Sequence, residues 1–146
     1  MIQIPPEIQI KATIRTGSVY YFVEETQTSN EPHYFIVINN DPRNDNILLL
    51  VCSSSNIEGA KRRRKNILNT IVLIKKKEYA GFSMDSVIDC NMVYDRSIEN
   101  IILRLRSGDL KMKPEFPIHL VEKLRKAALN SPLVKNEIKD LLRKSE

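Results

Sequence analysis

The residues with the clearest capacity for chemistry are a histidine and two serines at the ends of apolar runs. His33 opens the run HYFIVINN at residues 33–40, directly after a short polar connection. Ser53 and Ser54 follow the apolar run ILLLV at residues 47–51. Histidine is the side-chain type that exchanges protons near neutral pH, and a serine hydroxyl can donate a hydrogen bond to a phosphate oxygen. The pattern favours proton-transfer chemistry at the ends of neighbouring strands.

Positive charge is concentrated in two short runs. The net charge is +5, and eight of the 23 lysines and arginines fall within residues 61–77. Clustered cations gain free energy on a phosphate backbone by releasing counterions, although such a run also occurs as a solvated loop. Consecutive helical residues are about 100° apart and would point in all directions, so we expect a mobile loop that closes over a bound strand. The runs are Lys61, Arg62, Arg63, Arg64 and Lys65, followed by Lys75, Lys76 and Lys77.

These residue types meet the requirements of metal-free RNA cleavage. A base takes the proton of a 2′-hydroxyl, an acid protonates the departing 5′-oxygen, and cations stabilise the charged phosphorane. Asp89 and Asn91, on a later apolar stretch, add a carboxylate and an amide to the candidates. Many basic proteins contain the same inventory, so composition alone does not select this activity.

Other classes of site are not indicated. The sequence has no Gly-rich phosphate loop, HExxH, GxSxG or paired CxxC motif. Cys52 and Cys90 are far apart and match no zinc spacing, so we expect buried thiols in a reducing cytoplasm and no metal or cofactor. His119 lies at the start of a predicted helix and is interpreted as a surface or capping residue.

The first two thirds of the chain predict short strands. Continuous or alternating apolar segments are separated by turn residues, including NDPRND as a tight loop, with no long helix between them. This spacing favours a small antiparallel barrel or half-barrel over a parallel α/β sheet. The expected strands cover residues 18–25, 33–40, 46–53, 70–76 and 85–93.

The last third predicts amphipathic helices that cover the sheet or a partner chain. Residues 95–108 form a helix closed by Gly108, and residues 117–130 form a second. A third begins with Ser131 as N-cap and Pro132 at its first helical position. The 146 residues therefore predict one α+β domain, with a barrel over about 10–95 and helices over about 96–146.

Neither a secretory signal nor a membrane span is indicated by the sequence. The start of the chain lacks a cationic segment followed by an apolar block, and no run approaches the roughly 18 apolar residues that a membrane span needs. We therefore expect a cytoplasmic protein.

With its elements in this order, the sequence resembles the MazF/PemK toxins of bacterial type II toxin–antitoxin systems. The similar blocks are TGSVYYFVE (16–24), EPHYFIVINND (31–41), ILLLVCSSS (47–55), DSVIDCNMV (85–93) and LRKAALNSPLVKNEIKDLL (124–142). Each block is loose, but their order and spacing are moderately specific. The resemblance implies a small SH3-like antiparallel β-barrel of about five to six strands with C-terminal helices.

The resemblance also implies a function. Family members are metal-independent endoribonucleases, usually homodimeric, that cleave single-stranded RNA and are neutralised by a cognate antitoxin. The family's arginine before the second strand falls on His33, and its threonine at the end of the next strand falls on Cys52 or Ser53, of which Ser53 keeps the hydroxyl. His33 and Ser53 are thus the expected catalytic residues. The expected RNA-binding residues are Ser54, Lys61, Arg62, Arg63, Arg64 and Lys65.

Two alternatives remain open at this point. The chain is compatible with a non-catalytic SH3-like module that binds RNA or a protein partner, because the family's later Arg-x-Asp position reads Asp89-Cys90-Asn91 here. A toxin-like fold acting on a protein target is a further possibility that rests on the fold alone.

Overall fold

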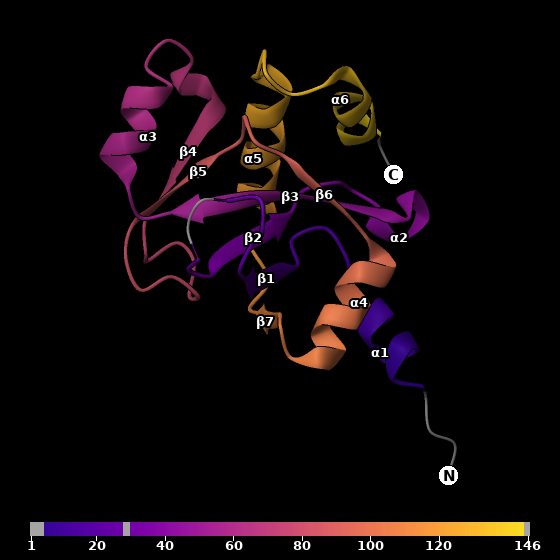
Figure 1. The fold of residues 1–146 in the computed structure, drawn as a ribbon. Helices are drawn as coiled ribbons and strands as arrows, with labels where there is room; N and C mark the ends of the chain where they lie inside the picture. The colour runs from indigo at the N-terminus through magenta and orange to yellow at the C-terminus, as the bar shows by residue number, and fades with distance from the viewer. Residues whose placement is uncertain (1–4, 28–29, 145–146) are drawn as a thin grey trace.

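The computed structural model describes residues 5–27 and 30–144, and these residues form a mixed α+β fold (Figure 1). An antiparallel sheet runs through the centre, and helices lie on both of its faces. The strands are β1 (Val19–Phe22), β2 (His33–Val37), β3 (Ile47–Ser54), β4 (Ile71–Ile74), β5 (Ser86–Asp89), β6 (Tyr94–Ser97) and β7 (Lys111–Lys113). The helices are α1 (Pro6–Ala12), α2 (Pro42–Asp45), α3 (Ile57–Arg63), the 3-10 turn η1 (Leu68–Thr70), α4 (Ile98–Ser107), α5 (Ile118–Asn130) and α6 (Asn136–Arg143).

Strand β3 is the central strand of the sheet and pairs with three others. On one edge it pairs with β2, and on the other it pairs with β6 along its first half and with β5 at its end. The strand order is β4-β5-β3-β2-β1-β7, with β6 beside β3, and every pairing is antiparallel. Because two different strands share one edge of β3, the sheet divides there into two arms.

The predicted α+β class and antiparallel sheet are confirmed, but the predicted barrel is not closed. Among the described residues, β4 and β7 are the end strands and do not pair with each other. Instead of strand closure, the apolar stripe of α5 packs between the arms, with Leu120 and Leu124 in the same core cluster as Ile74 and Ile88. A helix therefore buries the surface that a closing strand would have covered in a barrel.

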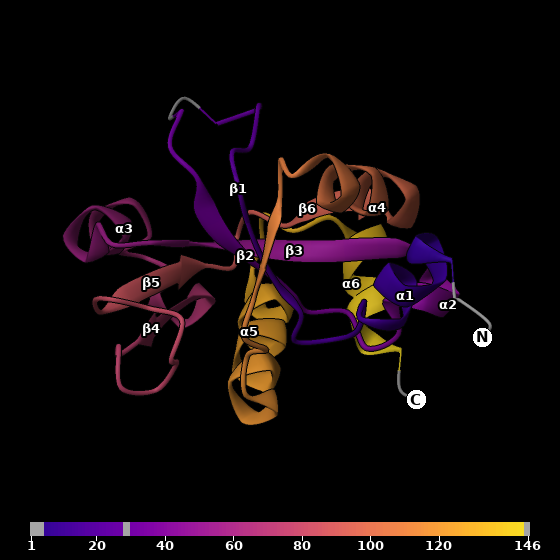
Figure 2. The same cartoon turned by 90° about the horizontal axis from the view of Figure 1, so that it is seen from below.

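The apolar core lies on both faces of the central strands. Leu49 and Val51 of β3 join the cluster under α5 and α6, whereas Leu48 and Leu50 join the cluster under α4. Figure 2 shows α4 and α5 on opposite sides of β3. Successive strand residues point to opposite faces, so burial of both faces explains why this strand is apolar without alternation.

The helical predictions have mixed outcomes. Gly108 closes α4 in the left-handed conformation, with φ of 85°, as predicted. The predicted start of the last helix is wrong, because α6 begins at Asn136 after a turn. The Ser131 hydroxyl is buried there and donates to Asn91 Oδ1 at 2.5 Å instead of capping a helix.

Several elements were not predicted. The segment NDPRND was expected to be a tight loop, yet it contains the one-turn helix α2, whose N-cap Asp41 accepts from Asn44 N. The predicted mobile loop over the first basic run is also wrong, since Lys61, Arg62 and Arg63 form the last turn of α3. No helix in the described part of the chain is long and apolar enough to cross a membrane.

Candidate functional site

An open cleft of about 580 Å³ lies where the ends of β2, β3 and β5 meet the C-terminal end of α3. His33 begins β2, Ser54 ends β3 and Arg63 ends α3. Three separate chain segments thus contribute an imidazole, a hydroxyl and a guanidinium group to the cleft. The lining residues are Thr26, Gln27, His33, Cys52, Ser53, Ser54, Asn56, Arg63, Asp89, Met92 and Tyr94. The predicted catalytic residues thus line one cleft, together with two of the six predicted RNA-binding residues.

The alternation of side chains along β3 puts Ser53 and Ser54 on opposite faces of the sheet. In the β2–β3 register the last pair is Phe35 opposite Cys52, and His33 and Ser54 each lie two residues beyond it. Because side chains alternate along a strand, Ser54 shares the face of His33, whereas the buried Ser53 points to the opposite face. The sequence predicted Ser53 as the serine that acts beside His33. The structure instead puts the Ser54 hydroxyl on the same face as His33.

The Ser54 hydroxyl is oriented by the backbone that follows it. Its Oγ accepts a hydrogen bond from Asn56 N at 3.1 Å, which leaves the hydroxyl hydrogen available to donate. Asn56 also caps α3, because its Oδ1 accepts from Gly59 N at 3.0 Å. The turn after β3 therefore orients the serine and starts the helix that carries Arg63.

Helical geometry divides the first basic run. Arg63 is on the cleft side of α3, while Lys61 and Lys65 line a separate hollow on its other side. Residues four apart share a helix face and residues two apart lie on opposite sides, which accounts for this split. Arg62 is exposed, and Arg64 is engaged by Asp89.

The Asp89 carboxylate is held by neighbours on both oxygens. Arg64 Nε donates to Oδ2 at 3.0 Å, and Asn91 donates to Oδ1 from its side chain at 2.7 Å and its backbone at 3.1 Å. Asn91 Nδ2 further donates to Thr70 Oγ1 at 2.7 Å. Asp89 and Asn91 were candidates for RNA cleavage, but these contacts give them a positioning role at the cleft wall.

Residues 24–27, which follow β1, are anchored beside the cleft. Glu24 pairs with Arg96 and accepts from Thr26 Oγ1 at 2.6 Å, while Gln27 Nε2 donates to the Tyr94 hydroxyl at 3.0 Å. Burial opposes ionisation of Glu24, but the hydrogen bonds from Thr26 and Arg96 outweigh it and lower the pKa of this carboxyl. Neither Gln27 nor Tyr94 was singled out from the sequence, because their importance arises from long-range packing.

Replacing Glu24 with glutamine is expected to destabilise the fold at pH 7 by roughly 1 to 2 kcal/mol, since a charged acceptor is lost from a buried pair. The folded-state pKa lies below the ordinary 4.5, so the contribution of Glu24 is present above pH 4.5 and disappears as the pH falls through the folded value. Urea unfolding of both proteins from pH 7 to pH 3 tests this. A difference that persists unchanged at pH 3 would contradict the assignment.

Cys52 faces the cleft but is poorly suited to act as a nucleophile. Burial raises the pKa of its thiol to about 11, and the hydrogen bond from Gln27 only partly offsets this. Cys90 is fully buried and its pKa is also raised by burial. Both are free cysteines. The prediction of a buried thiol is confirmed for Cys90, and Cys52 is half-buried.

Alkylation of Cys52 by iodoacetamide at pH 7.5 is expected to be roughly 10- to 100-fold slower than that of glutathione, because the thiolate is the reactive form. The rate should rise as the pH approaches 11. Mass spectrometry of the intact protein measures it, with Cys52→Ser as the control that leaves only Cys90. Labelling as fast as that of glutathione would show that the thiol is not shielded.

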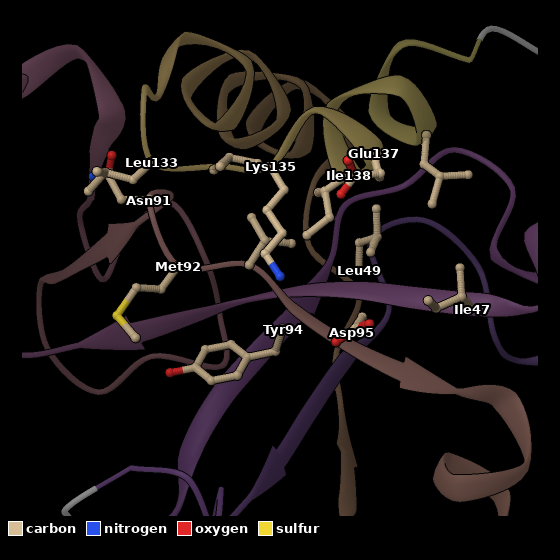
Figure 3. Close-up of a pocket in the computed structure, with 13 residues that line it drawn as sticks. Ile47, Leu49, Asn91, Met92, Tyr94, Asp95, Leu133, Lys135, Glu137 and Ile138 are labelled. Carbon is tan, nitrogen blue, oxygen red and sulfur yellow. The ribbon is translucent and has the colours of Figure 1, made fainter.

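A second groove adjoins the cleft and shares Met92 and Tyr94 with it. It has a volume of about 450 Å³ and lies between β3 and β6 on one side and the segment leading into α6 on the other (Figure 3). Ile47, Leu49 and Ile138 give it an apolar lining, and the side chain of Lys135 extends into it. A ligand that leaves the cleft past Tyr94 would enter this groove.

His119 is exposed on the first turn of α5, in agreement with its interpretation as a surface residue. Among the described residues, no group of three or more histidine, cysteine, aspartate or glutamate side chains is arranged to hold a metal ion.

No family model matches the chain, and no curated protein matches it either.

Proposed function

We propose that this chain is a cytoplasmic endoribonuclease of the MazF/PemK toxin type, with an SH3-like sheet, that cleaves single-stranded RNA without a metal ion. The observation that carries the proposal is that His33, Ser54 and Arg63 line one open cleft from three different segments. They are a proton-transfer group, a hydroxyl donor and a cation. As the sequence resemblance implies, the active form is a homodimer that a cognate antitoxin neutralises.

In the proposed reaction, His33 takes the proton of the 2′-hydroxyl as the 2′-oxygen attacks the adjacent phosphorus. The bond from phosphorus to the 5′-oxygen breaks, and the 5′-oxygen takes a proton from water in the open cleft. The hydroxide left by that water takes the proton from His33, which restores the neutral base. The products are a 2′,3′-cyclic phosphate and a 5′-hydroxyl. Ser54 donates to a nonbridging phosphate oxygen, and Arg63 offsets the charge that develops on the phosphorane.

The surroundings of His33 are suited to binding an extended RNA strand. His33 and Ser54 also border a smaller hollow of about 210 Å³, where Tyr21 and Tyr34 lie with their ring centroids 4.8 Å apart. Aromatic side chains of this kind stack on unpaired bases. The cleft adjoins this hollow at His33 and Ser54 and adjoins the second groove at Met92 and Tyr94, so both can hold bases that flank the proposed cleavage point.

Incubation of the purified protein with a mixed single-stranded RNA in EDTA tests the activity. We expect discrete fragments that end in a 2′,3′-cyclic phosphate, and an approximately 10-fold or greater loss of rate in Ser54→Ala. Ser107→Ala, at an exposed serine at the end of α4 that lines neither the cleft nor the smaller hollow, is the matched control. Binding of the RNA without fragments in wild type would instead favour the non-catalytic binding module.

Charge reversal at Arg63 is expected to weaken RNA binding and to lower the salt dependence of binding. Loss of one phosphate contact on a single strand reduces the slope of log K against log salt by about 0.7, and the added repulsion increases the effect. Arg62→Glu makes the same change of charge on an exposed residue that does not line the cleft. Fluorescence anisotropy of a labelled oligonucleotide at several salt concentrations compares them. Equal slopes would remove Arg63 from the binding site.

A further inference from the structure

A hydrophobic patch bordered by lysines lies on the far side of α3 from the cleft. Leu68, Ile71 and Leu73 line a hollow of about 410 Å³ together with Lys61 and Lys65, and we call this surface the β4 patch. Leu68 is 54% exposed and Leu73 is 48% exposed. Large aliphatic side chains gathered in a hollow at this exposure are typical of a binding surface.

The strand beneath the patch has an open edge. β4 is an end strand of the sheet, and among the described residues it pairs only with β5. Cys90 N donates to Thr70 O at 3.0 Å, and counting along the register from this bond turns the backbone groups of Val72 and Ile74 toward β5. The N–H and C=O groups of Leu73 and the C=O of Ile71 therefore point away from the sheet, where another strand can bond to them, whereas the Ile71 N–H donates to Leu68 O.

The charged side chains that line the hollow have one sign. Lys61 and Lys65 are both exposed, and the residues that line the hollow include no acidic side chain. The second basic run continues directly from the end of β4 with three further exposed lysines. These are Lys75, Lys76 and Lys77. The patch therefore combines aliphatic contacts, unpaired backbone groups and a positive rim.

We propose that the β4 patch binds an extended segment of another protein in which acidic and aliphatic residues alternate. The segment adds a strand to the edge of β4, places its aliphatic side chains against Leu68 and Leu73, and directs its carboxylates to the lysines. The inference does not depend on the proposed ribonuclease activity, because the patch shares no lining residue with the cleft.

Two other occupants fit less well. The patch has no aromatic side chain on which a base could stack, and the unpaired backbone groups of a strand edge match a peptide rather than a nucleic acid. Pairing of β4 with β4 of a second copy would bring the lysine rims of both copies together, and like charges across an interface are unfavourable.

The test uses the full chain and a fluorescent peptide of alternating glutamate and valine, measured by anisotropy. The proteins are wild type, Leu73→Ser and Lys61→Glu/Lys65→Glu. Each variant is expected to bind the peptide about tenfold or more weakly than wild type, since apolar burial or charge attraction is lost. The matched controls are Leu103→Ser and Lys123→Glu/Lys126→Glu, which alter exposed residues on α4 and α5 and should bind like wild type.

Peptide variants test the pairing mode itself. A peptide of alternating lysine and valine is expected not to bind. Two further peptides carry N-methyl groups on the odd or the even residues, and at least one of them should lose about tenfold or more in affinity, because strand addition needs donors on one edge of the peptide. Equal binding of both methylated peptides and the parent overturns strand addition.

Three further results would overturn the proposal. They are no binding of the glutamate–valine peptide to wild type, binding that is unchanged in Leu73→Ser, and a wild-type dimer in sedimentation that Leu73→Ser dissociates. The last result would assign the patch to a second copy. Loss of single-stranded RNA binding in Lys61→Glu/Lys65→Glu, with peptide binding unchanged, would assign the lysines to nucleic acid.

Discussion

Replacing His33 with alanine is expected to reduce the rate of RNA cleavage by about 100- to 10,000-fold, the range that general base catalysis contributes. His33 is the histidine of the cleft, and the nearby carboxylate of Asp89 is occupied by Arg64 and Asn91. The thiol of Cys52 is protonated at neutral pH because its pKa is raised to about 11. The other groups that could accept a proton are therefore much less available, and the loss should be large.

The measurement is single-turnover cleavage of a labelled RNA, with binding followed in parallel by anisotropy. We expect binding within about threefold of wild type, since a proton-transfer role affects the transition state more than the ground state. His119→Ala removes the exposed histidine on α5 and should leave the rate unchanged. Added imidazole should partly restore cleavage by His33→Ala. Full activity in His33→Ala would contradict the mechanism while leaving the family proposal intact.

The clustering of His33 with residues at the end of β3 was predictable from the sequence because apolar runs mark strands and their ends. The face on which each serine lies was not. A shift of one residue moves a side chain to the other face of a strand, and the register depends on pairing with β2 that no local pattern encodes. The family resemblance predicts Ser53 as catalytic and Ser54 as RNA-binding, whereas the strand register places Ser54 on the face of His33.

The basic run shows the same limit in another form. Its composition predicts an interaction surface, but five consecutive cations in a helix cannot share a single face, so the sequence predicts a mobile loop. The structure keeps them on or just after α3 and divides them, with Arg63 toward the cleft, Arg64 toward Asp89 and the two lysines toward the β4 patch. Because α3 lies between the cleft and the β4 patch, its cations contribute to two different surfaces.

The unclosed barrel has a comparable cause. Strand lengths and spacing predicted the antiparallel sheet, but whether its ends meet depends on which elements fill the space between the arms. Here α5 fills that space. The sequence predicted the apolar stripe of this helix but not its position between the arms of the sheet. The polar network around Asn91 was equally inaccessible, because its partners come from 21 and 40 positions away along the chain.

Replacing Asn91 with alanine is expected to give the largest loss of stability among these variants, about 3 kcal/mol or roughly 6 to 12 °C in Tm. The Asn91 amide donates to Thr70 Oγ1 and Asp89 Oδ1 at 2.7 Å, and its oxygen accepts from the Ser131 hydroxyl at 2.5 Å. Thr70 and Ser131 are fully buried, so truncation leaves the Ser131 hydroxyl hydrogen without its acceptor and Thr70 Oγ1 without its donor, away from water, although Thr70 still donates to Ile67 O and Ser131 Oγ still accepts from Leu133 N. One amide thus joins η1, the end of β5 and the connection from α5 to α6.

Thermal unfolding of Asn91→Ala and Asn91→Asp distinguishes this network from simple loss of packing. Asn91→Asp keeps the side-chain shape but removes both amide donors and places a second carboxylate beside Asp89, so its deficit relative to wild type should be larger at pH 7 than at pH 4. Asn69→Ala, beside Thr70 but exposed, is the matched control and should change stability by less than about 0.5 kcal/mol. A deficit in Asn91→Ala no larger than that of the control would mean that these hydrogen bonds contribute little net stability. The wall of the cleft that carries Asp89 would then have to be held by the Arg64 ion pair and the packing of α5.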